Sequence, residues 1–177
     1  IAMLQGNTWT PHPPGPNLPG NVVPRLQATR NPAGETVIWA ATEGGLARFE
    51  RGKWSTFSVA SGFPGKIIRS LLAVQTPGAG ATLWVGTFGG LARYAPGLWS
   101  SFTLQSGLSE NVVFAVREAA PGDYWFATLG GGLNHLQNGQ WSKVDHIQGQ
   151  PALASMGLLK PEPRPGAAAL VAGVRGV

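Results

Sequence analysis

The pattern of apolar and polar residues along the chain is typical of short strands separated by turns. Three segments, TVIWAAT (36–42), TLWVGT (82–87) and DYWFAT (123–128), are almost continuously apolar instead of alternating. A strand has this pattern when neighbouring layers cover both of its faces. Gly, Pro, Asn and Asp bound the strand-like segments, as expected for turns. No stretch combines helical spacing with end caps, so the pattern predicts an all-β fold.

The strand-like segments recur with a nearly constant period. One tryptophan series is spaced by 45 and 41 residues, and glycine pairs at 44–45, 89–90 and 131–132 keep the same step. The members of this first series are Trp39, Trp84 and Trp125. A second series is spaced by 45, 45 and 42 residues and consists of Trp9, Trp54, Trp99 and Trp141. Four short strands in a repeat of this length predict a β-propeller of four-stranded antiparallel blades. The second-strand tryptophans are then expected to be core residues.

The clearest copy of the repeat predicts strands at 111–119, 124–129, 133–138 and 140–145. We expect one domain over residues 1–177, with about four blades in the chain. Three complete blades are expected at about 20–58, 65–104 and 111–146, and residues 152–177 together with 1–12 are expected to be halves of a split fourth blade. Either the halves meet and close a ring, or the chain belongs to a larger ring, which we favour.

Composition changes this picture little. Gly (26) and Pro (15) approach a quarter of the 177 residues, but seven Trp and seven Phe argue against disorder. The net charge of +5 comes from 13 scattered Lys and Arg, so no nucleic-acid partner is expected. The chain has no cysteine and therefore no disulfide. It shows no signal peptide or membrane span, and its start at isoleucine indicates an excerpt, so a membrane would be reached only through parts outside this chain.

The sequence offers no legible catalytic or metal site. Its three histidines, His12, His135 and His146, follow no metal-ligand spacing. Asp145 precedes His146, but adjacent strand residues point to opposite faces and do not form a dyad. We therefore expect no enzyme, no cofactor and no bound metal.

The glycine pairs and two arginines allow functional interpretations, but structural ones are preferred. A glycine pair can form an anion-binding nest, but here a strand follows and no Lys-Ser/Thr is present. Positive φ in a tight turn is the favoured role of the glycines. Arg48 and Arg93 occupy equal positions in the third strand, where His135 stands in another copy. We expect the arginines to make structural pairs or simply to snorkel, the alternative being a ligand contact.

The string LWVGTFGGLARYAPGLWSSFTLQSGLSENVV (83–113) resembles the two-component regulator propeller repeat. Residues 36–66 and 123–148 match the same pattern well, whereas the flanking halves match loosely. The resemblance implies an extracytoplasmic sensor propeller of a bacterial hybrid histidine kinase or related protein. It further implies a carbohydrate or other small ligand and a location on the periplasmic or extracellular side of an inner-membrane protein.

The turns between second and third strands, and the connections between blades, are expected on one face of the propeller. Loops on a rigid scaffold commonly bind ligands. The residue before each glycine pair varies between copies, and polar residues lie beside it. The candidate ligand-binding residues are Glu43, Phe88, Leu129 and Arg175, with Asn21, Lys66, Glu110 and Asn111.

The leading hypothesis is thus a non-catalytic, ligand-sensing propeller of a bacterial signalling protein. The alternative is a protein-interaction or self-assembling scaffold propeller without a small ligand. Fold alone does not decide between them. The partners expected are a carbohydrate or other small ligand, and a homo-oligomer or further blades that complete the ring.

Overall fold

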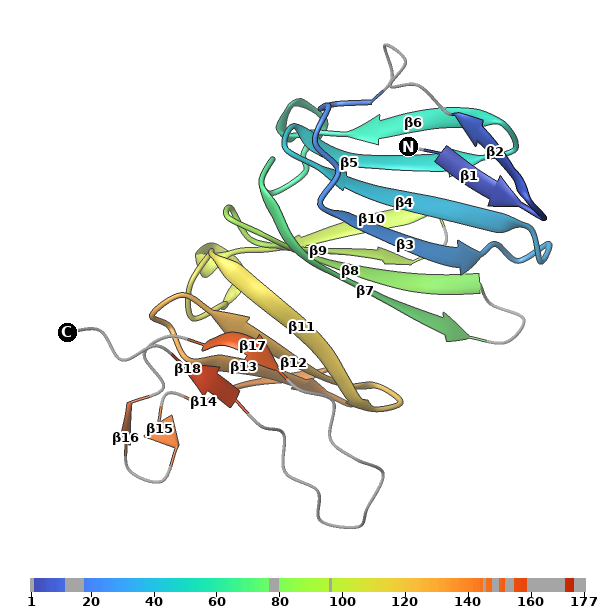
Figure 1. The fold of residues 1–177 in the computed structure, drawn as a ribbon. Helices are drawn as coiled ribbons and strands as arrows, with labels where there is room; N and C mark the ends of the chain where they lie inside the picture. Colours follow the sequence, from blue (N-terminus) through green and yellow to red (C-terminus); the bar gives the residue numbers. More distant parts are fainter. Residues whose placement is uncertain are drawn as a thin grey trace.

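A computed structural model gives the architecture of the chain. It describes residues 2–11, 18–76, 80–95, 97–144, 146–147, 150–151, 155–158 and 171–173. These residues form three four-stranded antiparallel sheets and three two-stranded ones (Figure 1). The predicted all-β class and the four-stranded antiparallel unit are therefore confirmed.

Each four-stranded sheet is a simple meander of consecutive strands. Sheet I consists of β3 (Arg25–Arg30), β4 (Thr36–Thr42), β5 (Gly45–Glu50) and β6 (Lys53–Phe57). Sheet II consists of β7 (Ile68–Thr76), β8 (Gly80–Thr87), β9 (Leu91–Ala95) and β10 (Leu98–Phe102). Sheet III consists of β11 (Val113–Ala120), β12 (Asp123–Thr128), β13 (Leu133–Gln137) and β14 (Gln140–Val144). The four strands predicted for the last copy match sheet III to within two residues at each end.

The remaining strands form separate hairpins. β1 (Ala2–Gln5) pairs with β2 (Thr8–Pro11), β15 (His146–Ile147) with β16 (Gln150–Pro151), and β17 (Ser155–Leu158) with β18 (Val171–Gly173). The β15–β16 hairpin was not predicted. β17 contacts β11 and β12 of sheet III. The two expected half-blades thus belong to separate sheets, and the split blade stays a prediction.

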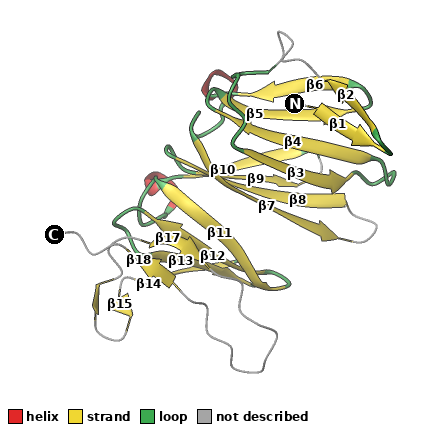
Figure 2. Ribbon diagram, viewed as in Figure 1, coloured by secondary structure: helices red, strands yellow, loops and turns green. Residues whose placement is uncertain are grey.

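The sheets are stacked through their first strands. β3 contacts β7, β7 contacts β11, and β11 contacts β17. Each first strand is an edge of its sheet, since the order within each sheet follows the sequence. Short 3₁₀ turns, η1 (Val59–Ser61) and η2 (Leu104–Ser106), lie in the connections between sheets (Figure 2). This repeated stacking brings the loops of neighbouring sheets together.

The core lies between the sheets, where second-strand tryptophans fill the space. Trp39 and Trp84 are each only 1% exposed. Trp39 packs against Tyr94 and Trp99 of the next sheet, with ring centroids 5.1 and 6.1 Å away. Gly86 lets the next layer approach closely, since a β-carbon there would lie 2.7 Å from the Val113 carbonyl oxygen. The core role predicted for the second-strand tryptophans is confirmed for Trp39 and Trp84, whereas Trp125 is half-buried.

Candidate functional site

The connections between sheets are built by a repeated local motif. After β6 the Ser58 and Ser61 side chains form a capping box around η1, and Gly62 ends it at φ 85°. Thr103 and Ser106 do the same around η2, before Gly107 at φ 103°. Left-handed glycine turns the chain back, so that the next residue, Phe63 or Leu108, is buried between two sheets. Each connection is therefore anchored in the core before it crosses to the next sheet.

The crossing segment packs directly on the glycine turn of the sheet ahead. A β-carbon on Gly89 would collide with the carbonyl oxygen of Pro64, and one on Gly44 with that of Pro19. Neither glycine has a positive φ, so the predicted turn role is wrong for these two. It is right for the second members, Gly45 at φ 143° and Gly90 at φ 146°. The first glycine of each pair instead permits backbone contact between the two loops.

A buried threonine fastens each glycine turn. The hydroxyl of Thr87 donates to the Gly90 carbonyl oxygen at 2.8 Å and accepts the Gly89 amide at 3.0 Å. Thr42 makes the same two bonds in sheet I. Thr128 donates to the Gly132 carbonyl oxygen in sheet III. These bonds pair polar groups that burial would otherwise leave unsatisfied, and they make the loop face rigid.

In sheet III the preceding connection is joined to the sheet by side-chain hydrogen bonds as well. Buried Asn134 accepts the Ser109 amide at 3.0 Å and donates to the Ser109 hydroxyl at 2.7 Å. Ser109 takes the place that Pro64 has in the previous connection, and it also bonds to Thr128. Alanine occupies the corresponding position of β9, at Ala92. Side-chain hydrogen bonds thus replace the proline contact here.

The turn residues predicted to face a ligand are exposed on this loop face. Glu43, Phe88 and Leu129 are all solvent-accessible, the last two at 36% and 45%. The Phe88 amide donates to the Ile67 carbonyl oxygen at 3.0 Å, and Leu129 bonds in the same way to Val112 at 2.9 Å. These bonds hold each turn against the end of the crossing segment, at the residue just before the first strand of its own sheet. Arg175 lies outside the described residues.

The polar neighbours predicted beside the turns differ in their contacts. Asn21 and Lys66 are exposed. Glu110 and Asn111 are half-buried and serve the loop itself, because the Glu110 carboxylate accepts the Asn111 amide at 2.6 Å and Asn111 Oδ1 accepts the Leu104 amide at 2.8 Å. Of the four, Asn21 and Lys66 therefore keep the most accessible polar groups.

A three-residue cluster stands out at the inner edge of this face. Arg69 and Phe114 each occupy a β-bulge near the start of a first strand, between Ile68 and Ser70 in β7 and between Val113 and Ala115 in β11. The Arg69 guanidinium carbon lies 4.4 Å from the Phe88 ring centroid and 5.7 Å from that of Phe114. The Phe88 and Phe114 rings meet edge to face at 6.0 Å. We call Arg69, Phe88 and Phe114 the loop-face cluster.

Sequence reasoning found one member of this cluster and missed two. Phe88 was identified because it varies where the surrounding turn is constant. Arg69 and Phe114 fall at equal positions of IIRSLL (67–72) and VVFAVR (112–117), so comparing the strand starts of the two copies could have paired them. Their orientation depends on the bulge, which re-aims a side chain at a sheet edge. The alternation of residues along the strand gives no sign of the bulge.

A second arginine joins the cluster from sheet I. Arg25 Nε donates to the Arg69 carbonyl oxygen at 2.8 Å. Arg25 is exposed and lies at the start of β3. The inner edge of the loop face therefore combines two guanidinium groups with two aromatic rings, drawn from all three four-stranded sheets.

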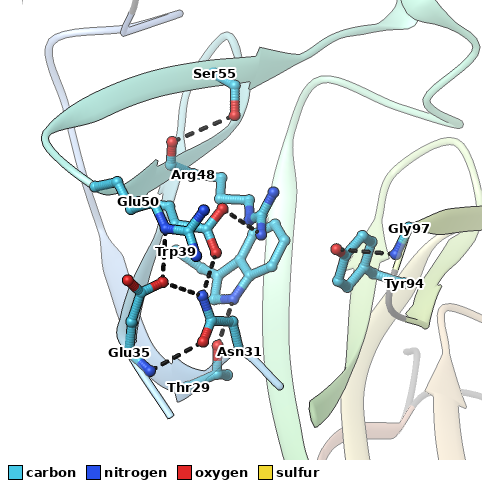
Figure 3. Close-up of polar contacts among 10 residues, drawn as sticks. Thr29, Asn31, Glu35, Trp39, Arg48, Glu50, Ser55, Tyr94 and Gly97 are labelled. Carbon is cyan, nitrogen blue, oxygen red and sulfur yellow. Dashed lines mark hydrogen bonds and ion pairs between the residues drawn. The ribbon is translucent and has the colours of Figure 1, made fainter. Parts of the chain in front are cut away.

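The third-strand arginines lie over buried tryptophan rings, which agrees with the structural role predicted for them. The Arg48 guanidinium lies 5.4 Å from the Trp39 ring and pairs with Glu50 at 2.7 Å (Figure 3). Arg93 lies 5.5 Å from the Trp84 ring. In sheet III His135 stacks on Trp125, with centroids 4.0 Å apart, and bonds to Asp123 at 2.7 Å. A cavity of about 20 Å³ near Arg48 has room for roughly one water and no larger ligand.

The turns of sheet I at the strand ends opposite the loop face carry a small charged network. Asn31 donates to Glu35 at 2.7 Å and to Glu50 at 2.9 Å, and Arg51 pairs with Glu35 at 2.7 Å (Figure 3). The hydrogen bond from Asn31 and then the one from Arg51 lower the pKa of Glu35, and Glu35 in turn raises the pKa of Arg51. These partners leave the network internally paired.

Neither a metal cluster nor a membrane-spanning helix is found among the residues that the structure describes. In this part of the chain, no group of three or more His, Cys, Asp or Glu side chains is placed to hold a metal ion. None of its helices is long and apolar enough to cross a membrane.

Comparison with known proteins gives structural neighbours only. No family model and no curated protein matches the chain. Among solved structures, the extracellular domain of the one-component system BT4673 of B. thetaiotaomicron is similar at a TM-score of 0.56, with 22% identity over 81% of this chain. The extracellular domain of the hybrid two-component system BT3049 of the same organism is similar at 0.53, with 18% identity over 71%.

These neighbours establish similarity of fold. The chain spans about a fifth of their length, 20% and 19% respectively. Both neighbours are extracellular domains of one- or two-component signalling systems.

Proposed function

We propose that the chain is part of a non-catalytic, ligand-sensing β-propeller on the extracytoplasmic side of a bacterial signalling protein. Two independent lines support this proposal. The repeat sequence resembles that of sensor propellers, and the structural neighbours are extracellular domains of signalling systems. The observation that carries the ligand-binding part is the loop-face cluster, with its exposed aromatic ring beside an arginine.

The loop face is suited to binding because its frame is rigid while its exposed residues vary. Threonine-to-glycine bonds and loop-to-turn backbone contacts repeat from sheet to sheet. Glu43, Phe88 and Leu129 then differ at equivalent positions. A preorganised surface of this kind loses little entropy when a ligand binds. The cluster joins sheets II and III, so a ligand there would couple two sheets.

We further propose that a larger ring includes the three sheets as blades. Leu26 of β3 is 54% exposed, whereas the equivalent Leu71 and Val116 pack against the preceding sheet. β1 and β2 have the sequence of third and fourth strands, and they leave this inner part of sheet I uncovered. The occupant that fits is the first two strands of a further copy of the repeat. Such a pair would bury Leu26 and extend the edge of β1.

The ligand-binding proposal can be tested with a panel of neutral and acidic oligosaccharides, scored by thermal shift. We expect at least one saccharide to raise the melting temperature of the wild-type chain, with the shift lost in Phe88→Ala. Leu98→Ala is the matched control, since Leu98 is exposed on β10 and lies outside the cluster. Shifts that are unchanged in Phe88→Ala, or absent for the whole panel, would contradict the proposal. Absence of any shift together with a bound protein partner would favour the scaffold alternative.

A further inference from the structure

Arg69 differs from Arg48 and Arg51 in how its guanidinium is held. Arg48 and Arg51 are paired with carboxylates at 2.7 Å. Arg69 is held by aromatic rings, at 4.4 Å from Phe88 and 5.7 Å from Phe114. Within the described part of the chain, no carboxylate or carbonyl oxygen accepts a hydrogen bond from its guanidinium. Its N–H donors therefore remain available.

The surroundings of Arg69 restrict its motion and add positive charge. The bulge between Ile68 and Ser70 turns Arg69 to the inner edge of the sheet, and the two rings limit where its plane can lie. Arg25 donates to the Arg69 carbonyl oxygen, which brings a second guanidinium to the same edge. A planar guanidinium that is already ordered binds a planar carboxylate through two parallel hydrogen bonds at low entropic cost.

We propose that the loop-face cluster recognises a carboxylate of its ligand, bound in bidentate fashion by Arg69, with the adjoining apolar face of the ligand against Phe88. This inference rests on the proposed function and specifies its ligand class, an acidic saccharide such as a uronate. A neutral saccharide would leave the guanidinium donors without a charged partner.

The test follows the Nε–Hε resonance of each arginine by NMR while D-glucuronate is added to the full chain. D-glucose is the matched neutral probe, and sodium sulfate is an anion without the sugar ring that would pack on Phe88. We expect the Arg69 resonance to move saturably with glucuronate and not with glucose, and to move less with sulfate. Arg48, already paired with Glu50, is expected to stay in place.

Two variants complete the test. Arg69→Lys keeps the charge but loses the planar fork, and it should weaken glucuronate binding at least about tenfold. Arg30→Gln, at an exposed site on β3, should leave it unchanged. Circular dichroism melting of both variants establishes that they fold.

Three outcomes would overturn the inference. Equal and non-saturating shifts at Arg69 and Arg30 would mean nonspecific ion binding. Equal responses to glucose and glucuronate would exclude carboxylate recognition. A neutral saccharide that loses binding in Phe88→Ala but keeps it in Arg69→Gln would leave the proposed function intact and refute this inference alone.

Discussion

Gly89 lies directly against the carbonyl oxygen of Pro64, so closely that no β-carbon fits between the turn and the preceding loop. The pair joins the connection out of sheet I to the turn between β8 and β9. Because Thr87 and Phe88 take their positions from this turn, the contact sets the geometry of the loop face. Its consequence can be measured.

Gly89→Ala should destabilise the fold by about 2–4 kcal/mol, since the added methyl group must push two backbone segments apart. Gly34→Ala is the control. Gly34 has φ 80° but nothing within 4 Å of an added β-carbon, so only backbone strain of about 1 kcal/mol is expected. Urea unfolding of both variants compares the two effects. Equal losses would show that close approach is not what requires glycine at 89.

Trp84→Ala should cost about 3–5 kcal/mol, because it empties space between sheets II and III next to Tyr124 and Phe126. Trp9→Ala should cost less than about 0.5 kcal/mol, since Trp9 is 64% exposed on β2. Both residues belong to the periodic tryptophan pattern, and only their burial differs. Comparable free energies of unfolding for the two variants would contradict the layered core.

Acid should weaken the network around Glu35. The hydrogen bonds from Asn31 and Arg51 lower the pKa of Glu35 in the folded state. The folded state therefore prefers the ionised carboxylate, which contributes stability above the unfolded-state pKa. That contribution is lost as pH falls through the lowered folded pKa.

We therefore expect Glu35→Gln to be less stable than the wild type at pH 7 and the difference to shrink between about pH 5 and pH 3. The effect should be small, since exposed ion pairs contribute little. Urea midpoints of both proteins across this pH range provide the measurement. A difference that stays constant or grows on acidification would contradict the lowered pKa of Glu35.

Exposure of Leu26 predicts head-to-tail association, because β17–β18 of a second copy can act as first and second strands beside β1 and cover Leu26. Leu26→Lys should weaken this association at least about tenfold, since burying an unpaired ammonium is costly. Leu98→Lys, at another exposed leucine, on β10, should not weaken it. Sedimentation velocity over a concentration series compares the three proteins. A chain that remains monomeric throughout, or equal association of both variants, would contradict completion by a further copy.

Much of the fold could be predicted from the sequence because the same pattern of strands and turns occurs in three copies, and each copy supports the assignment made for the others. Continuous apolarity at TVIWAAT and TLWVGT indicated strands covered on both faces, and Trp39 and Trp84 are buried as that requires. The prediction of a positive φ at Gly89 was wrong. A close approach between two loops and a positive φ both require glycine, and the sequence alone does not distinguish the two causes.

Only part of the candidate site was predictable. Phe88 was found through its variation at a constant position. Arg69 and Phe114 were missed because β-bulges turn them to the inner edge, and a bulge changes register without changing residue type. Asn134 was missed because its function depends on Ser109, a partner 25 residues away that only the packing of two loops brings into contact.

The central claim is that ligand binds on the loop face at the cluster of Arg69, Phe88 and Phe114. Hydrogen exchange of the chain, with and without the saccharide that gives the largest thermal shift, tests it most directly. We predict slower exchange at the Phe88 and Leu129 amides, which bond to the crossing segments on this face. Protection confined to the opposite face, at the turns around Gly34 and Gly122, would contradict the claim.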